Sequence, residues 1–179
     1  PPLAQLGIGG ISMGIAAGDV TGDGRWDLFV TNFAEDFSTL YAGAAGEVFE
    51  DVSRATGIGP MMFRPMSWGT AFADFDNDGD LDLVVANGHI YPQIDKHPEL
   101  VGTFAQRSLY AENLGAGKTP LFRDATADAG PGFEMLRSSR GLAAGDYDND
   151  GDLDLVLTNL DAAPRLLRNE GSVNSWLTV

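Results

Sequence analysis

The stretch Gly69-Thr-Ala-Phe-Ala-Asp-Phe-Asp-Asn-Asp-Gly-Asp-Leu-Asp-Leu-Val-Val-Ala-Asn87 lies near the middle of the 179-residue chain, and related versions of it begin at Gly14 and Gly141. Each version joins a segment of small residues to an acidic loop, and an apolar run then ends in Asn five residues after the loop. The first and second loops begin 55 residues apart, and the second and third 72 residues apart. Internal repetition of this kind decides the fold before any other pattern is considered.

Each repeat predicts four short strands, the first of which is the small-residue segment before the loop. The other three recur as an apolar run, an apolar pair and a closing segment: 28–30, 40–41 and 48–52; 83–85, 109–110 and 121–125; 155–157, 166–167 and 176–179. The apolar runs are too short for helices. Four-stranded units of this length are typical of propeller blades, and Gly and Ala suit the crowded inner strand of such a ring.

The sequence therefore predicts an all-β fold of three β-propeller blades, covering residues 1–59, 60–130 and 131–179. The only helical turns expected are short ones at 53–56 and 127–129. A complete propeller has about four to eight blades. We therefore expect these three to form part of a larger ring, completed by further sequence or by other chains.

The acidic loops at 19–27, 74–82 and 146–154 follow the pattern Asp-x-Asp-x-Asp-Gly-x-x-Asp, with Thr21 in place of the second Asp of the first loop. Side chains at positions 1, 3 and 5 can converge on one cation, Gly at position 6 permits a sharp turn, and the position-7 carbonyl adds a neutral oxygen. Calcium takes about six to eight oxygen ligands and suits this set better than magnesium. The sequence predicts three calcium sites.

The predicted ligands are the side chains at positions 1, 3, 5 and 9 and the backbone carbonyl at position 7. They are Asp19, Thr21, Asp23, Arg25 and Asp27; Asp74, Asp76, Asp78, Asp80 and Asp82; and Asp146, Asp148, Asp150, Asp152 and Asp154. An EF-hand would need Glu at position 12, where this chain has Val30, Val85 and Leu157, so position 9 must close each site. The alternative is that these residues form only solvated turns, which Asp and Asn favour. Because Thr21 is uncharged, the first site is predicted to be the weakest.

The chain has 26 acidic against 11 basic residues, a formal net charge of −15 and no cysteine. Such acidity argues against nucleic acid or an anionic membrane as the main partner, because both would repel it. No apolar run approaches the ~18–20 residues that cross a bilayer, and disulfides and zinc–sulfur sites are excluded. Because the chain begins Pro1-Pro2 without an initiator Met, we expect a processed or excised piece.

Together these motifs resemble the FG-GAP/VCBS repeats of integrin α-subunit propellers, and more specifically the ASPIC/UnbV (cartilage acidic protein-like) family. The resemblance is carried by Met13-Gly-Ile-Ala-Ala-Gly-Asp19, Phe49-Glu-Asp-Val-Ser53, Trp68-Gly-Thr-Ala-Phe-Ala-Asp-Phe-Asp-Asn-Asp-Gly-Asp80, Asn87-Gly-His-Ile-Tyr-Pro92 and Leu167-Arg-Asn-Glu-Gly171. It implies a calcium-bearing propeller of about seven blades that is exported and engaged in adhesion or matrix contacts. Residues 167–177 resemble the start of that family's C-terminal module.

The leading functional prediction is a calcium-binding extracellular scaffold or interaction module, secreted, at the cell surface or in the periplasm, that contacts protein or carbohydrate surfaces. One alternative is a filament or surface-assembly subunit whose open blade edges recruit further copies. Another is an enzyme that uses the propeller face. The chain has no nucleophile elbow, P-loop or dinucleotide fingerprint, and no catalytic residue is predicted.

An insertion distinguishes the second repeat, where 27 positions separate the end of the loop from the apolar pair, against 13 in the first repeat. The inserted segment 88–104 contains both histidines of the chain, and long loops with ionisable groups often carry function. His89, Tyr91, Asp95 and His97 are therefore the candidate ligand or partner contacts, with an ordinary surface loop as the alternative.

Two further groups of large residues are expected to pack rather than to bind. The methionine-rich segment 61–66 is predicted to plug the space between blades, with an adaptable binding surface as the alternative. Trp26, Trp68 and Trp176 are predicted to be packing residues.

Overall fold

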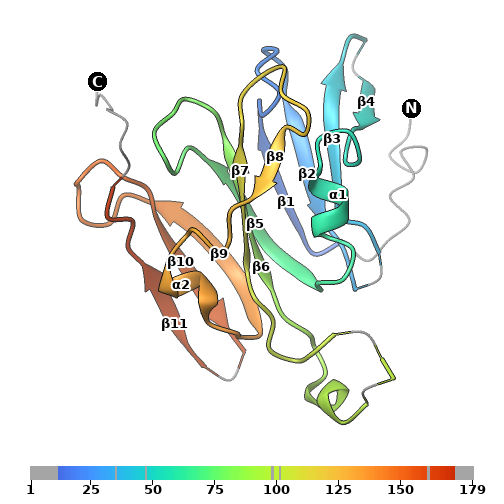
Figure 1. Ribbon diagram of the computed structural model, residues 1–179, viewed down its shortest axis with the longest axis vertical. Helices are drawn as coiled ribbons and strands as arrows, with labels where there is room; N and C mark the ends of the chain where they lie inside the picture. Colours follow the sequence, from blue (N-terminus) through green and yellow to red (C-terminus); the bar gives the residue numbers. More distant parts are fainter. Residues whose placement is uncertain are drawn as a thin grey trace.

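The computed structural model describes residues 12–34, 36–46, 48–97, 99–100, 102–160 and 162–171. Their strands form three antiparallel sheets that lie side by side (Figure 1). Blade 1 consists of β1 (Gly14–Gly18), β2 (Asp27–Thr31), β3 (Thr39–Ala44) and β4 (Val48–Asp51). Blade 2 consists of β5 (Ser67–Ala73), β6 (Asp82–Asn87), β7 (Leu109–Asn113) and β8 (Phe122–Asp124). Blade 3 consists of β9 (Ser139–Gly145), β10 (Asp154–Asn159) and β11 (Ala162–Leu167).

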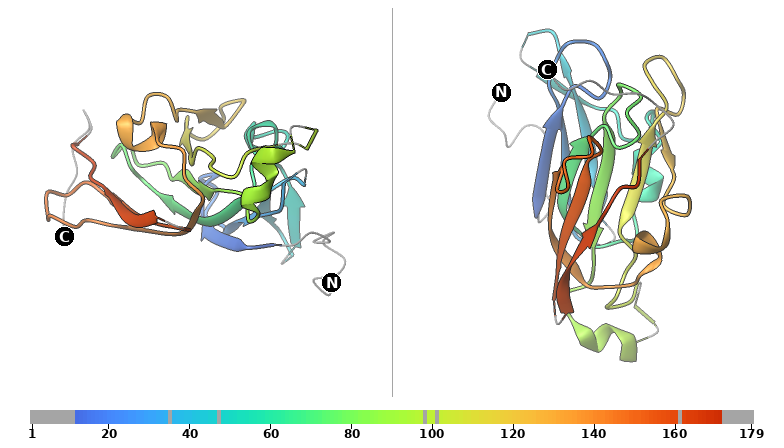
Figure 2. Two further views of the ribbon diagram at one scale, coloured as in Figure 1. Left: turned by 90° about the horizontal axis from the view of Figure 1, so that it is seen from below. Right: turned by 90° about the vertical axis from the view of Figure 1, so that its left-hand side faces the viewer.

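The predicted all-β fold with blade-like antiparallel sheets is confirmed, and the strands of each sheet follow sequence order. The fourth strand predicted for the third repeat, at 176–179, lies outside the described residues. Closure into a larger propeller stays a prediction, since the three described sheets do not form a ring (Figure 2).

Helical structure in the described part of the chain is limited to α1 (Ile58–Met61), the 3-10 helix η2 (Pro92–Lys96) and α2 (Pro131–Glu134). None of these is long and apolar enough to cross a membrane. The short turns predicted at 53–56 and 127–129 are present, with the Thr56 N–H donating to the Val52 carbonyl at 2.9 Å and the Ala129 N–H to the Ala125 carbonyl at 3.1 Å. The expectation that they would be the only ones was wrong, because α1, η2 and α2 form as well. Gly57, with φ 86°, precedes α1, and Pro131 begins α2 because its fixed φ suits the first helical position.

The inner strands β1, β5 and β9 pack against one another in succession. A Cβ on Gly14 would lie 2.2 Å from the carbonyl oxygen of Trp68, and one on Gly69 would lie 2.7 Å from that of Arg140. Glycine is therefore required at the start of an inner strand, because the backbone of the next blade passes there. This explains the small-residue segment in front of each loop.

Hydrophobic side chains fill the space between successive blades in two clusters. The cluster between blades 1 and 2 consists of Val20, Phe29, Leu40, Ile58, Met62, Leu83, Val85, Leu109, Ala111, Leu121 and Phe122. The cluster between blades 2 and 3 consists of Ala73, Phe75, Val84, Ala86, Phe133, Leu155 and Leu157. Met62 is fully buried in the cluster between blades 1 and 2 and Met61 packs against it, so the predicted methionine plug is confirmed for this part of the segment. Met66 is fully buried too but belongs to neither cluster.

The tryptophans behave differently from one another. Trp68 donates its indole N–H to the Gly88 carbonyl at 2.7 Å, and the Arg140 guanidinium lies 4.0 Å from the centre of its ring. Trp26 is 69% exposed, so the prediction that it packs was wrong. The adjacent Asp27 faces inward at the start of β2, and because side chains alternate along an extended chain, Trp26 faces solvent. Trp176 lies outside the described residues.

The register of the sheets corrects one detail of the predicted repeat. Phe29 pairs with Leu40 in blade 1, and Val84, at the same distance from its loop, pairs with Tyr110 in blade 2. Leu40 is therefore equivalent to Tyr110, and the predicted alignment of Leu40 with Leu109 was wrong by one residue. Two adjacent apolar residues fit either alignment in sequence, and only the strand pairing selects one.

The Asn that ends each apolar run holds the strand ends opposite the loops. Its side-chain oxygen accepts a hydrogen bond from the hydroxyl of a Ser at or just before the start of the inner strand. The oxygen–oxygen distances are 2.9–3.1 Å in the pairs Ser12–Asn32, Ser67–Asn87 and Ser139–Asn159. Its amide donates to a carbonyl that precedes or begins the third strand, at 2.7–3.0 Å. The recurrent Asn is therefore a structural bracket across three strands.

Candidate metal sites

The three acidic loops join the first two strands of each blade and lie at the same end of the sheets, the upper end in Figure 1. The inserted segment with η2 extends from the opposite end (Figures 1 and 2). The two groups of predicted site residues therefore belong to opposite ends of the molecule.

All three loops have the same backbone. Both oxygens of the position-1 Asp accept hydrogen bonds from the N–H groups of positions 5 and 6, at 2.7–3.2 Å. Position 4 is left-handed in every loop, with φ 70° at Gly22, 57° at Asn77 and 62° at Asn149, and the position-6 glycines are left-handed too. Asn tolerates this conformation better than most residues. The Asn of the second and third loops thus has a backbone role that the sequence analysis did not assign.

The position-9 residues Asp27, Asp82 and Asp154 are at most 1% exposed. One oxygen of each accepts the position-2 N–H, and the other accepts an N–H on or just after the third strand, all at 2.8–3.2 Å. This carboxylate therefore ties each loop to its blade whether or not it also contacts a metal.

Within the second loop and within the third loop, the structure brings three carboxylates close to one another. One oxygen each from Asp74, Asp76 and Asp78 lies within 4.8 Å of the others, and the same holds for Asp146, Asp148 and Asp154. Among the described residues these are the groups of three or more potential ligands that could hold a metal ion. Asp82 and Asp150 were predicted as ligands too, but these two groups do not include them.

The second loop concentrates negative charge in a partly buried place. Burial, followed by repulsion from Asp78, raises the pKa of Asp76, and the same causes in the same order raise the pKa of Asp80. Burial raises the pKa of Asp82 to about 7, against hydrogen bonds from the Asn113 N–H and the Tyr110 hydroxyl. A cation bound among the carboxylates would relieve this repulsion, so the all-oxygen donor set fits calcium.

The first loop differs in its charges. Arg25 forms an ion pair with Asp23 and donates its Nε–H to the Gly43 carbonyl at 2.8 Å. The hydroxyl oxygen of Thr21, at position 3, is buried and has no hydrogen-bond partner in the described chain. A buried hydroxyl without a partner is costly, and a cation in this loop would give it one. The loop fits a cation, but its own Arg25 competes for one of the ligands.

Side chains from outside the third loop donate hydrogen bonds to two of its aspartates. Arg168 donates to Asp148 at 3.2 Å and also forms an ion pair with Glu170. The Asp152 side chain, at position 7, is 8% exposed and accepts a hydrogen bond from Asn77 of the second loop at 2.6 Å. Only the backbone carbonyl of Asp152 was predicted as a ligand, and the side chain has this separate role.

Of the four residues singled out in the inserted segment, the rings of His89 and Tyr91 lie together, with centroids 5.9 Å apart, whereas Asp95 and His97 have separate partners. His89 is 7% exposed, its Nδ1 accepts the Tyr91 N–H at 3.1 Å, and its carbonyl accepts the Ser138 hydroxyl of blade 3 at 2.8 Å. Asp95 accepts an N–H from within the segment, and the exposed His97 is paired with a neighbouring Glu at 2.9 Å. His89 therefore helps to join blades 2 and 3, and the geometry gives no support to catalysis by this loop.

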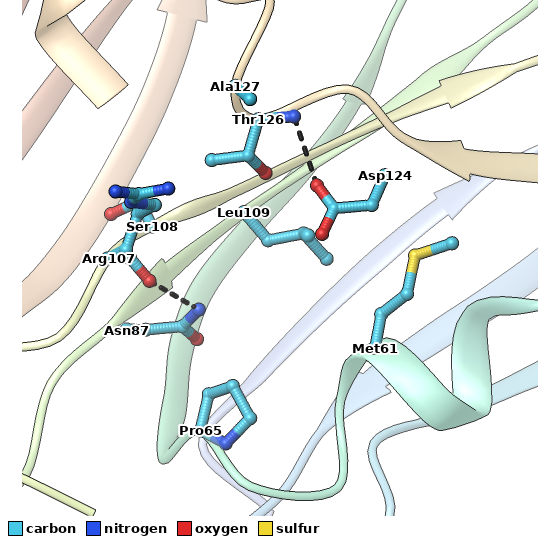
Figure 3. Close-up of a pocket in the computed structure, with 9 residues that line it drawn as sticks. All are labelled: Met61, Pro65, Asn87, Arg107, Ser108, Leu109, Asp124, Thr126 and Ala127. Atoms are coloured by element: carbon cyan, nitrogen blue, oxygen red, sulfur yellow. Dashed lines mark hydrogen bonds between the residues drawn. The ribbon is translucent and has the colours of Figure 1, made fainter. Parts of the chain in front are cut away.

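A pocket of about 320 Å³ opens at the end of blade 2 opposite the acidic loops (Figure 3). It is lined by Met61, Pro65, Asn87, Arg107, Ser108, Leu109, Asp124, Thr126 and Ala127. The Asn87 amide donates to the Arg107 carbonyl, and Asp124 accepts the Thr126 N–H, as the dashed lines in Figure 3 show. These bonds hold the ends of strands, and blade 1 repeats them, so they are structural.

Comparison with known proteins agrees with this architecture. Residues 19–85, from the start of the first loop to β6, match the FG-GAP-like repeat family. This match confirms the resemblance to FG-GAP repeats that the sequence predicted.

Three relatives of the chain are the same protein from three organisms. The chain is 26% identical over 159 residues to cartilage acidic protein 1 of Xenopus tropicalis, which covers 88% of this chain and 21% of the relative. Cartilage acidic protein 1 of Mus musculus and that of Homo sapiens are also 26% identical over 159 residues, covering 87% of this chain and 21% of each relative. The chain thus spans about a fifth of the length of these relatives.

Proposed function

We propose that the chain is part of a calcium-stabilised extracellular β-propeller that serves as a scaffold or interaction module. The observation that carries this proposal is the threefold repetition of one loop backbone, with three carboxylate oxygens within 4.8 Å of one another in two of the loops. Clustered carboxylates repel one another, and a bound cation would remove this repulsion.

Calcium would supply positive charge and neutralise these clustered carboxylates. Asp74, Asp76 and Asp78 would hold it in the second loop, and Asp146, Asp148 and Asp154 in the third. In the first loop, Asp19 and Thr21 would contribute, together with Asp23 once Arg25 has released it. Because each loop is tied to its own blade through position 9, a bound ion would stabilise the blade rather than a free loop.

An extracellular location is supported by the similarity to a protein named for cartilage. Calcium loops with few charged ligands bind weakly, at roughly 10⁻⁴–10⁻³ M in extracellular modules, and need the calcium levels found outside cells. A protein or carbohydrate surface suits the module better than nucleic acid does, because the net charge is −15.

Thermal unfolding with calcium and with chelator tests the proposal. At free calcium about 100 times Kd, one site adds about 2.7 kcal/mol and three independent sites roughly 8, against a typical domain stability of ~5–15 kcal/mol. We expect the melting temperature to fall by many degrees on chelation and to recover with calcium, but not with equal magnesium. The double variant Asp76→Asn/Asp148→Asn should lose most of this response. A melting temperature that is indifferent to chelator would refute calcium stabilisation.

A further inference from the structure

Blades 2 and 3 are joined at the loop end by two side-chain hydrogen bonds that run in opposite directions. Asn169, just after the third strand of blade 3, donates its amide to the position-2 carbonyl of the second loop, that of Phe75, at 2.8 Å. Asn77, at position 4 of the second loop, donates its amide to Asp152, at position 7 of the third loop, at 2.6 Å. We name these two bonds the inter-blade clasp.

Blades 1 and 2 have one half of the same clasp. Asn113, equivalent to Asn169, donates its amide to the position-2 carbonyl of the first loop, that of Val20, at 2.9 Å. Position 4 of the first loop is Gly22, which has no amide side chain to offer to Asp80 at position 7 of the second loop. The first half of the clasp therefore recurs at both junctions, and the second half depends on the residues at positions 4 and 7.

The outer flank of blade 3 presents the same elements again. Tyr147 is at position 2 of the third loop and Asn149 at position 4, and no hydrogen bond from the described residues reaches the Tyr147 carbonyl or the Asn149 amide. Val156 on β10 is 41% exposed, whereas Val84, at the equivalent position of β6, is fully buried against blade 3. Gly141 occupies the position at which Gly14 and Gly69 meet the backbone of the next inner strand.

We propose that this flank docks a further blade of the same repeat that carries Asn after its third strand and Asp at loop position 7, and that it discriminates against blade 1 of a second copy. The incoming Asn would donate to the Tyr147 carbonyl, and the incoming Asp would accept the Asn149 amide. The flank thus specifies its partner by two polar residues, in addition to the apolar contact that Val156 offers.

Blade 1 of a second copy lacks both of these residues. The position equivalent to Asn113 and Asn169 is Gly43, and position 7 of the first loop is Arg25, which already forms an ion pair with Asp23. A Cβ at Gly43 would lie 2.4 Å from the Trp26 carbonyl oxygen, so this blade cannot easily acquire the Asn. Head-to-tail assembly of identical chains would therefore form neither half of the clasp, which argues against the filament alternative.

The inference rests on the blade architecture of the proposed function but not on calcium, so the test is made at saturating calcium, where the loops are fully formed. Sedimentation velocity of the full chain over a concentration series measures self-association. We expect at most weak association of the parent chain, without a contribution from Asn149, and association of Arg25→Asp that is roughly five- to tenfold stronger than that of Arg25→Ala, because Asp at position 25 supplies one half of the clasp. Arg25→Ala, which only removes the cation, is the matched control.

Adding Asn149→Gly to Arg25→Asp removes the amide and keeps a residue that tolerates the left-handed backbone, as Gly22 does in the first loop, so association should return to the level of Arg25→Ala. Two results would overturn the proposal: equal association of Arg25→Asp and Arg25→Ala, or association of the parent chain that Asn149→Gly weakens. If calcium does not raise the melting temperature in the thermal experiment, the proposed calcium binding is refuted. The sedimentation experiment then still decides the clasp proposal separately.

Discussion

The first and second acidic loops share one backbone and differ in the charge of the side chains at positions 3 and 7. At position 3 the first loop has Thr21 where the second has Asp76, and at position 7 it has Arg25 where the second has Asp80. Both loops keep Asp at positions 1 and 9 and Gly at position 6, and both form the same hydrogen bonds there. The shape of the loop is thus set by one group of positions and its charge by another, so a repeat can keep its fold while its affinity for metal changes.

The largest effect should come from removing the charged residue at position 3. Asp76→Ala takes a carboxylate out of the second cluster, and we expect calcium to bind that loop about ten- to a hundredfold more weakly, since interactions with charged groups contribute about 1.5–3 kcal/mol. Thr21→Ala removes only a neutral hydroxyl from the first loop and should weaken it by less. Calorimetric titration of both variants makes the comparison, and equal losses would show that charge at position 3 does not distinguish the loops.

The converse change should bring the first loop closer to the second. Thr21→Asp adds the missing carboxylate at position 3, and we expect calcium to bind the first loop roughly tenfold more tightly. Thr21→Asn, which has nearly the same size and no charge, is the control and should give little gain in the same titration. A gain of equal size from Asn would assign the effect to geometry instead of charge.

Much of this comparison could be predicted from sequence because it depends on residues that are close together in the chain. The order of strands and the position of the three loops follow from local spacing. The left-handed Asn77 and Asn149 were accessible too, since position 4 is Gly in the first loop and Asn in the other two. The weaker first loop stays a prediction. The Ser67–Asn87 bracket had a signal as well: a Ser two residues before the Gly of each inner strand.

Other features depend on contacts between residues far apart in sequence. Arg168 reaches the third loop from the end of β11, and Asn77 reaches Asp152 from a different blade. The spacing of the repeats does not report either contact. His89 was selected as an ionisable residue in a long loop, but burial beside the next blade gives it a structural role, and burial depends on the assembled fold.

The arginine contacts of the first and third loops should have a smaller effect on calcium binding. Arg25→Ala should tighten the first loop and Arg168→Ala the third, because each removes a cation that competes with calcium for a carboxylate. Both arginine side chains are 50% exposed, so each ion pair should contribute only about 0.2–1 kcal/mol, and we expect gains of a few-fold at most. The gains should shrink at high salt. A gain that does not change with ionic strength would point to a different cause.

The smallest effect should come from completing the clasp between blades 1 and 2. By analogy with Asn77 and Asp152, Gly22→Asn should direct an amide toward Asp80 from a left-handed position that Asn77 and Asn149 already occupy in the other loops. Its Cβ would lie 3.3 Å from that of Ala116, which has to shift slightly. We expect about 1 kcal/mol of added stability in urea unfolding at saturating calcium, from one hydrogen bond and a less flexible unfolded chain. In an Asp80→Ala background the hydrogen-bond part of this gain should disappear. An undiminished gain there would leave Asp80 without a role at this junction.

All three loops are proposed to bind calcium, the first of them most weakly. Nuclear magnetic resonance titration of the calcium-free chain tests this proposal, because the position-6 amides of Gly24, Gly79 and Gly151 each report on one loop. We expect all three signals to shift as calcium is added, with Gly24 saturating last. Saturation of Gly24 before the other two, or the absence of any shift at Gly79 and Gly151, would contradict the claim.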